Sequence, residues 1–183
     1  MNKIFKENIM RYAFGWNHKA WQYPLKSAKL PSDKKFSRIL EIGASGYSVV
    51  AIIFDGLADE IVISYYQDNQ RVLIENYLSE LDRKSKLKST YILEKTDAYT
   101  VAEKFDLVIM KSVLGGLFRE NTTSLVQVEC FVNDLIRRTV SKDGSLILID
   151  NGKPFYQRFL SRFGARKNEW RFFTKADLSM ASK

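Results

Sequence analysis

A chain of 183 residues, of which 45% are hydrophobic, is long enough to bury one substantial core and favours a single domain. One cysteine, Cys130, and one histidine, His18, exclude disulfides, thiolate zinc sites and multi-histidine metal centres within one chain. No apolar run approaches the ~20 residues of a membrane span, and the first residues lack the apolar segment of a secretion signal. We therefore expect a cytoplasmic protein with no metal site, whose chemistry depends on carboxylates, Lys, Tyr, Ser or positioning.

The net charge of +8 is concentrated at the two ends of the chain. Residues 1–36 and residues 152–183 each carry eight Lys or Arg against two acids, or +6 each, which leaves −4 for residues 37–151. Basic flanks are typical of contact with an anionic partner, and equally of solvated lysines that keep a protein soluble. We predict a basic helical flank over 1–36, a core over 37–151 and a basic helical segment over 152–183 that is incomplete.

Apolar strands alternate with amphipathic helices through the core. We expect strands at 38–43, 60–66, 91–93 (beginning near Thr90), 105–110 and 145–149, helices at 47–57, 68–84 and 124–140, and a turn at 142–144. Strands that are separated by helices form a parallel sheet with right-handed crossovers and helices on both faces. The predicted fold class is therefore α/β, a doubly wound and mainly parallel sheet.

A ligand of such a sheet binds outside the carboxyl ends of its strands. The residues at those ends are Glu41, Gly43, Ala44, Ser45 and Gly46, then Ser64, Tyr65 and Tyr66, then Asp97 and Ala98, then Lys111 and Ser112, and last Asp150 and Asn151. Glycines admit a ligand close to the backbone, and the amides at the start of the next helix face it. Carboxylates after the first and third strands suit a ligand with an ammonium, ribose hydroxyls and an adenine amino group, although each acid alone also fits a cap.

Four segments carry a family resemblance: Leu40-Glu41-Ile42-Gly43-Ala44-Ser45-Gly46, Thr96-Asp97-Ala98, residues 105–109 and residues 140–149. In this order they resemble the cofactor loop, the adenine-contacting turn, the fourth strand and the entry to the fifth strand of class I S-adenosylmethionine-dependent methyltransferases. Residues 111–117 and 169–174 are also similar to a bacterial subgroup often associated with surface-polysaccharide or sugar modification. The resemblance implies a Rossmann-like fold and S-adenosylmethionine as cofactor.

The resemblance also implies roles for individual residues. Glu41 organises the loop near the methionine ammonium, and Gly43 to Gly46 admit the carboxylate and the ribose. Asp97 and Ala98 face the adenine, while Lys111 offers its backbone carbonyl near the methionine end. Ser112 follows Lys111 at the same rim.

Three features depart from the family pattern. Ser45 and Tyr47 stand at the second and third glycine positions of the loop, so the loop is shaped differently. Tyr65 or Tyr66 replaces the usual ribose-binding acid, which leaves the hydroxyl contacts to a phenol or to Asp68. We also expect the family's two closing antiparallel strands to be missing after the fifth, as in a shortened piece of a longer protein or in a sheet whose edge a second subunit covers.

Methyl transfer is an in-line displacement at a sulfonium, so alignment matters most, and a base is needed only when the nucleophile starts protonated. Asp150 is our first candidate for that base and His18 the second, although Asp150 equally fits a structural cap. No Asp-Pro-Pro-Tyr-like segment follows the fourth strand, and Cys130 lies inside a predicted helix, which argues against adenine and cytosine methylation. We expect methylation of an oxygen on a small anionic or sugar-type acceptor.

Five other interpretations stay open. A nicotinamide-dinucleotide enzyme shares the glycine turn, but Gly43-Ala44-Ser45-Gly46 is not Gly-x-Gly-x-x-Gly. A non-catalytic binding module would keep the fold without the ribose acid. Aromatics interleaved with arginines in 155–175 suit an RNA methyltransferase, and the N-terminal helix suits contact with the inner membrane surface, a lid or core packing. An exposed sheet edge suits a homo-oligomer.

Overall fold

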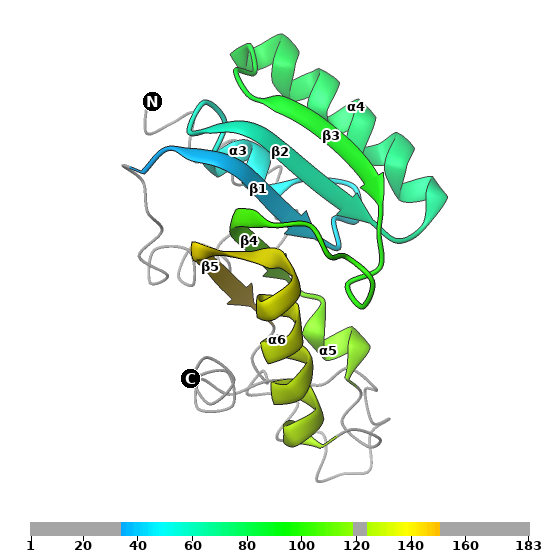
Figure 1. Cartoon of the computed structure of the whole chain (residues 1–183). Helices are drawn as coiled ribbons and strands as arrows, with labels where there is room; N and C mark the ends of the chain where they lie inside the picture. The colour runs from blue at the N-terminus through cyan, green and yellow to red at the C-terminus, as the bar shows by residue number, and fades with distance from the viewer. Residues whose placement is uncertain (1–33, 119–123, 151–183) are drawn as a thin grey trace, which may run out of the picture.

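The computed structural model describes residues 34–118 and 124–150. They form one five-stranded sheet of β1 (Phe36–Ile42), β2 (Ala58–Tyr65), β3 (Thr90–Lys95), β4 (Phe105–Lys111) and β5 (Val140–Ile149). The strand order is β3-β2-β1-β4-β5, and every neighbouring pair is parallel (Figure 1). The predicted α/β, doubly wound parallel sheet is confirmed, and its order reverses between β1 and β4.

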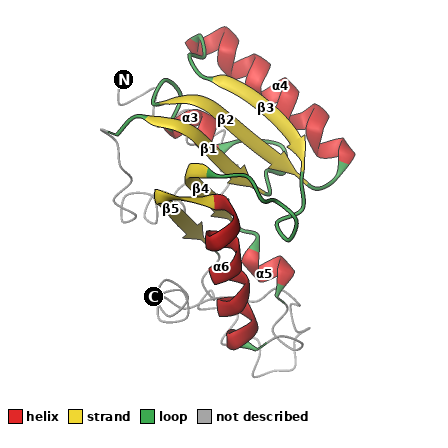
Figure 2. Cartoon of the chain, viewed as in Figure 1, coloured by secondary structure: helices red, strands yellow, loops and turns green. Residues whose placement is uncertain are grey.

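Helices cover both faces of this sheet (Figure 2). On one face lie α3 (Val49–Ile53) and α4 (Asp68–Ser85), which bury Val50 and Ile74. On the other face lie α5 (Leu114–Leu117) and α6 (Leu125–Thr139), whose core side chains include Leu114, Phe131 and Leu135. None of the helices in the described ranges combines the length and the apolarity that a membrane crossing needs.

The central strands are buried on both faces. Successive residues such as Ile39 and Leu40 in β1, or Leu107 and Val108 in β4, are at most 1% exposed. Such continuous apolar runs are typical of parallel strands between two helical layers. In β3, at the edge of the sheet, Tyr91 is half-buried while Ile92 is exposed.

Helix α3 is shorter than the predicted helix over 47–57. Ser48 caps its start, and Gly56, with φ of 75°, ends any continuation after Phe54. Asp55 then accepts hydrogen bonds from the backbone amides of Lys88 and Ser89, at 2.8 and 3.0 Å. The residues that follow residue 53 therefore form a corner that packs against the segment leading into β3, and they do not continue the helix.

The predicted turn at 142–144 lies inside β5 instead of before it. Strand β5 starts at Val140, directly after α6, and its register with β4 shifts between Phe105 and Leu107. Phe105 pairs with Val140 and Leu107 with Ser145, so a step of two residues on β4 matches a step of five on β5. The other predicted boundaries agree with the structure to within two residues. The predictions for 1–33 and 151–183, including that of the missing closing strands, lie outside the described residues.

Candidate functional site

The loop that follows β1 is fastened to its neighbours at the carboxyl edge of the sheet. Gly43 has φ of 80°, and a Cβ there would lie 2.4 Å from Cγ2 of Val113. The Gly43 amide donates to Oγ of Ser64 at 3.3 Å, and the Ala44 amide donates to the Ser64 carbonyl at 2.9 Å. Only a glycine fits this position without strain, because both the backbone conformation and the close Val113 side chain disfavour a Cβ.

Glu41 is buried beneath this loop and caps α3. Its carboxylate accepts hydrogen bonds from the Ser48 hydroxyl and from the amides of Val49 and Val50, at 3.0 and 3.4 Å for the amides. Ser48 Oγ in turn accepts from the Ala51 amide at 2.9 Å. The expectation that these first-turn amides face a ligand is therefore wrong, since the protein's own side chains occupy them.

Burial raises the pKa of Glu41. The hydrogen bonds from Ser48 and from the Val49 amide, and the positive charge of Lys111, oppose that rise without cancelling it. Contact between Glu41 and a ligand ammonium stays a prediction.

Lys111, at the end of β4, extends its side chain toward the same loop. Its Nζ lies 2.8 Å from the hydroxyl oxygen of Tyr47 and 4.6 Å from the centre of the Tyr47 ring. Next to it, Ser112 has φ of 54° and donates its amide to the Ile149 carbonyl at 2.7 Å. The sequence interpretation gave Lys111 only a backbone role, so this ammonium was missed. The signal was available, because β1 and β4 are neighbours and Lys111 continues their register opposite Gly43.

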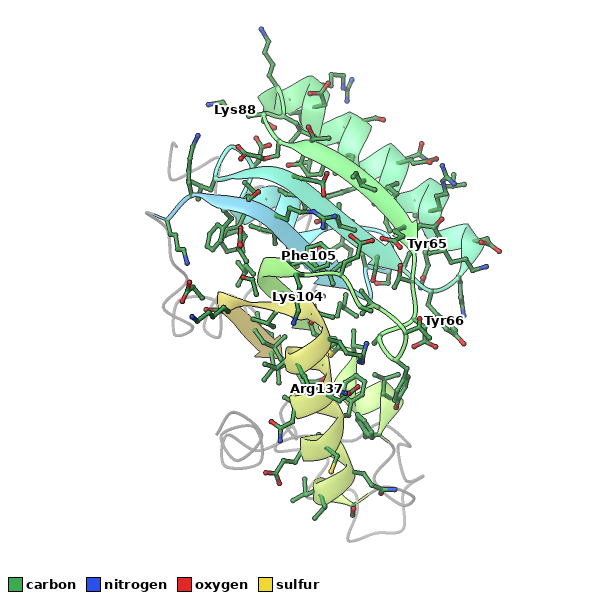
Figure 3. All side chains as sticks on the ribbon, in the orientation of Figure 1. Tyr65, Tyr66, Lys88, Lys104, Phe105 and Arg137 are labelled. Carbon is green, nitrogen blue, oxygen red and sulfur yellow. The ribbon has the colours of Figure 1, made fainter. Side chains whose placement is uncertain are left out.

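The two tyrosines at the end of β2 have different environments (Figure 3). Tyr65 is 4% exposed and belongs to the core between the sheet and α4, whereas Tyr66 is 67% exposed. The Tyr66 amide donates to Oε1 of Gln70 at 3.0 Å, which fixes the start of α4. Asp68 is exposed and pairs with Lys95 at 2.9 Å. Of the candidate ribose-contacting phenols, only that of Tyr66 is presented to solvent.

A tight turn follows β3 and contains Asp97 and Ala98. Oδ1 of Asp97 accepts from the Tyr99 amide at 2.9 Å, and the Asp97 carbonyl accepts from the Thr100 and Val101 amides at 3.0 and 3.2 Å. Ala98 is buried, and the half-exposed Tyr99 packs edge-on against Phe131 of α6 with ring centres 4.9 Å apart. These hydrogen bonds and the ring contact fix the turn at the rim of the sheet.

Thr96 lies between this turn and the end of β2. Its amide donates to the Tyr65 carbonyl at 3.1 Å. Its hydroxyl oxygen is the one buried side-chain polar atom that lacks a hydrogen-bond partner in the described part of the chain. Buried polar groups are rarely left unpaired, so a water molecule or a ligand group is the natural partner here.

Asp150 comes directly after β5, where Oδ2 accepts from the Gly115 amide of α5 at 3.1 Å. Oδ2 of Asp150 therefore acts as a cap for α5, as the structural interpretation of this residue predicts. His18 and Asn151 lie outside the described residues. Within 34–118 and 124–150 no group of three or more His, Cys, Asp or Glu could hold a metal ion, and Cys130 is exposed on α6.

No protein-family model and no curated protein matches this sequence. Solved structures match its fold. DhpI in a complex with S-adenosylmethionine has a TM-score of 0.58 at 14% identity, over 97% of this chain and 83% of that one. The N-methyltransferase NodS from Bradyrhizobium japonicum, bound to S-adenosylhomocysteine, has a TM-score of 0.59 at 13% identity, over 97% and 84%. YcgJ from Bacillus subtilis has a TM-score of 0.57 at 15% identity, over 87% of this chain and 66% of its own.

These similarities define the class of fold. The strand order and the two helical layers are those of a Rossmann-like α/β domain. The structural matches, at 13–15% sequence identity, have the same fold. More particularly, the chain has the Rossmann-like fold of S-adenosylmethionine-dependent methyltransferases.

Proposed function

We propose that the protein binds S-adenosylmethionine and transfers its methyl group to an oxygen of a small anionic or sugar-type acceptor. The observation that carries the proposal is the glycine loop at the point where the strand order reverses. Gly43 and Gly46 both have positive φ there, at 80° and 140°, so the backbone turns sharply at the carboxyl edge of the sheet. Ligands of doubly wound sheets bind at such a turn, outside the strand ends where the order reverses.

The methionine end of the cofactor fits between this loop and β4. Its carboxylate needs a positive partner, and the amides of α3 do not supply one because Glu41 and Ser48 occupy them. The Lys111 ammonium lies next to the loop, where Tyr47 orients it. We therefore assign the carboxylate contact to the side chain of Lys111, in addition to the backbone contact that the family resemblance implies.

The nucleoside end fits over the ends of β2 and β3. The exposed ring of Tyr66 offers an aromatic surface, and the unpaired hydroxyl of Thr96 offers a partner for a ribose or base atom. Asp97 uses Oδ1 within its own turn, so its Oδ2 is our candidate acceptor for the adenine amino group. Tyr65 has no such role because its ring is buried.

S-adenosylmethionine would supply a methyl group on a sulfonium. The acceptor oxygen would take that methyl group in line while the carbon–sulfur bond breaks and S-adenosylhomocysteine leaves as a neutral thioether. The chain's part is to align the acceptor and to take its proton. Among the residues that the structure describes, Asp150 is the candidate for the proton acceptor. It lies at the end of β5, next to the end of β4, where the Ser112 amide donates to the Ile149 carbonyl. His18 is the second candidate. The basic flanks favour an anionic acceptor. As lesser alternatives, they favour RNA as the acceptor, or contact of the protein with the cytoplasmic face of the inner membrane.

A non-catalytic binding module is the second candidate function. Tyr65 favours it, because a buried ring occupies the position where the family carries the ribose-binding acid. Such a module would bind the cofactor weakly or not at all.

Calorimetric titration of the full chain separates these functions. S-adenosylhomocysteine and 5′-methylthioadenosine are compared, since the second ligand lacks the amino-acid part. We expect Lys111→Met to weaken S-adenosylhomocysteine binding about tenfold, as for the loss of a charge-assisted hydrogen bond, and to leave methylthioadenosine binding unchanged. Lys88→Met is the matched control, because Lys88 lies at the other end of the sheet from Tyr66 (Figure 3).

Binding by the folded wild type is the decisive result. If neither ligand binds, the cofactor proposal is overturned and the non-catalytic module is favoured. If both bind, transfer of labelled methyl to sugar phosphates, to nucleotide sugars and to RNA identifies the acceptor class.

A further inference from the structure

We infer that Arg138, in the last turn of α6, is a positioning residue that fixes the turn over residues 97–101 so that Asp97 faces the adenine. The inference rests on the proposed function, because it concerns the nucleoside end of the same site. It adds a residue that lies on a helix on one face of the sheet and touches no ligand.

The guanidinium of Arg138 bridges two carbonyls of this turn. Nη2 donates to the Ala98 carbonyl at 3.1 Å, and Nη1 donates to the Val101 carbonyl. Nε donates to Oδ2 of Asp134 at 2.6 Å, one helical turn earlier. The Arg138 side chain is 16% exposed. All three bonds use the planar fork of an arginine, which a lysine cannot reproduce.

The turn depends on this bridge because residues 97–101 belong to neither a helix nor a strand. Fixing the backbone of each such residue costs about 1–2 kcal/mol of conformational entropy. Hydrogen bonds from a charged donor to two of its carbonyls offset part of that cost. Phe131, also on α6, adds the edge-on contact to Tyr99. Helix α6 therefore holds the turn through two side chains, Arg138 and Phe131.

Positioning at this place matters for base recognition. Ala98, whose carbonyl Arg138 holds, directly follows Asp97 along the chain. A shift of about 1 Å in a recognition group is enough to lose a hydrogen bond. Arg138 thus acts through the backbone on the carboxylate that we assign to the adenine amino group.

The chain provides a matched control in Arg137. Its Nη2 also pairs with Asp134, through Oδ1 at 2.7 Å, but its side chain is 78% exposed. No bond from its guanidinium to the turn is found among the described residues. Arg137→Met removes the same charge and one bond to the same acid, and leaves the bridge in place.

The test compares the binding of S-adenosylhomocysteine with that of S-inosylhomocysteine, in which oxygen replaces the adenine amino group. We expect Arg138→Met to weaken S-adenosylhomocysteine binding about tenfold and to reduce the preference over the inosine analogue toward one. Arg138→Lys is expected to give an affinity and a base preference between those of the wild type and Arg138→Met, because a lysine can still donate to one of the two carbonyls. Arg137→Met is expected to match the wild type in both measurements.

Hydrogen exchange of the ligand-free proteins gives a second readout. The amides of Thr100 and Val101 are expected to exchange faster in Arg138→Met than in the wild type or in Arg137→Met. If Arg138→Met does not fold, Arg138→Lys carries both measurements.

The outcomes separate this inference from the proposed function. An unchanged base preference in folded Arg138 variants, or an equal loss in Arg137→Met, overturns the role of Arg138 and leaves the cofactor proposal standing. No binding of S-adenosylhomocysteine by the folded wild type overturns both.

Discussion

Replacing Gly43 by alanine tests whether the loop after β1 depends on one missing methyl group. The added Cβ meets Cγ2 of Val113 at 2.4 Å, and the residue keeps φ of 80°. A left-handed conformation costs an alanine about 1–2 kcal/mol. Overpacking against a fixed neighbour costs about 1–3 kcal/mol more. The lower entropy of the unfolded alanine chain returns about 0.4–1 kcal/mol. We therefore expect Gly43→Ala to lower the free energy of unfolding by roughly 1–4.5 kcal/mol, with about 3 kcal/mol as the central value.

Gly56→Ala is the matched control for the backbone part of this loss. Gly56 has φ of 75°, but a Cβ there first meets Cδ of Lys88 at 3.1 Å, far along a flexible side chain. We expect it to cost about 1 kcal/mol, the backbone part alone. The difference between the two variants measures the contact with Val113.

Urea denaturation of both variants, and of Gly43→Ala combined with Val113→Ala, completes the test. Removing the Val113 methyl groups is expected to recover about 1–2 kcal/mol of the Gly43→Ala loss, beyond the sum of the single effects. The reasoning is refuted if Gly43→Ala and Gly56→Ala cost the same, or if Val113→Ala recovers nothing.

Two further predictions concern the carboxylate under the loop and the tyrosines of β2. Burial raises the pKa of Glu41 above its ordinary value of 4.5, so the stability it contributes is complete below about pH 4 and is lost as the pH rises through the raised value. Glutamine does not titrate, so the free energy of unfolding of Glu41→Gln should improve relative to wild type between pH 4 and 8; a difference independent of pH contradicts the raised pKa. Tyr65→Phe should leave S-adenosylhomocysteine affinity unchanged, whereas Tyr66→Ala should lower it about tenfold by removing an aromatic surface, and calorimetry showing the reverse would return the ribose contact to Tyr65.

Much of the fold is predictable from the sequence because the central strands are continuous apolar runs. Ile61, Val62 and Ile63 are buried on both faces, and such a run between polar turns indicates a parallel strand. The turn predicted at 142–144 is wrong, because strand β5 runs through these residues and pairs with β4 on both sides of them, which leaves only a bulge there. The local sequence pattern carries no information about this long-range pairing of β5 with β4.

The site is predictable as a set of positions and less so as a set of roles. The carboxyl ends of the strands place Glu41, Lys111 and Asp150 at one edge from topology alone. Their partners depend on tertiary contacts: Glu41 caps a helix, Lys111 meets Tyr47 and Asp150 meets Gly115. Arg138 escapes prediction because a basic residue in the last turn of a helix is usually solvated or interacts with the helix dipole.

The junction between α6 and β5 has a consequence for chain length. Because Thr139 ends the helix and Val140 already pairs with Phe105, no connecting segment separates the two elements (Figure 1). The spare length lies inside the strand, in the three extra residues between the pairs at Val140 and Ser145. A residue inserted or removed there changes the size of the bulge and leaves the pairing of Ser145 through Ile149 in register. The same change between Thr139 and Val140 has no spare length beside it, so it disturbs the pair of Val140 with Phe105 or the last turn of the helix.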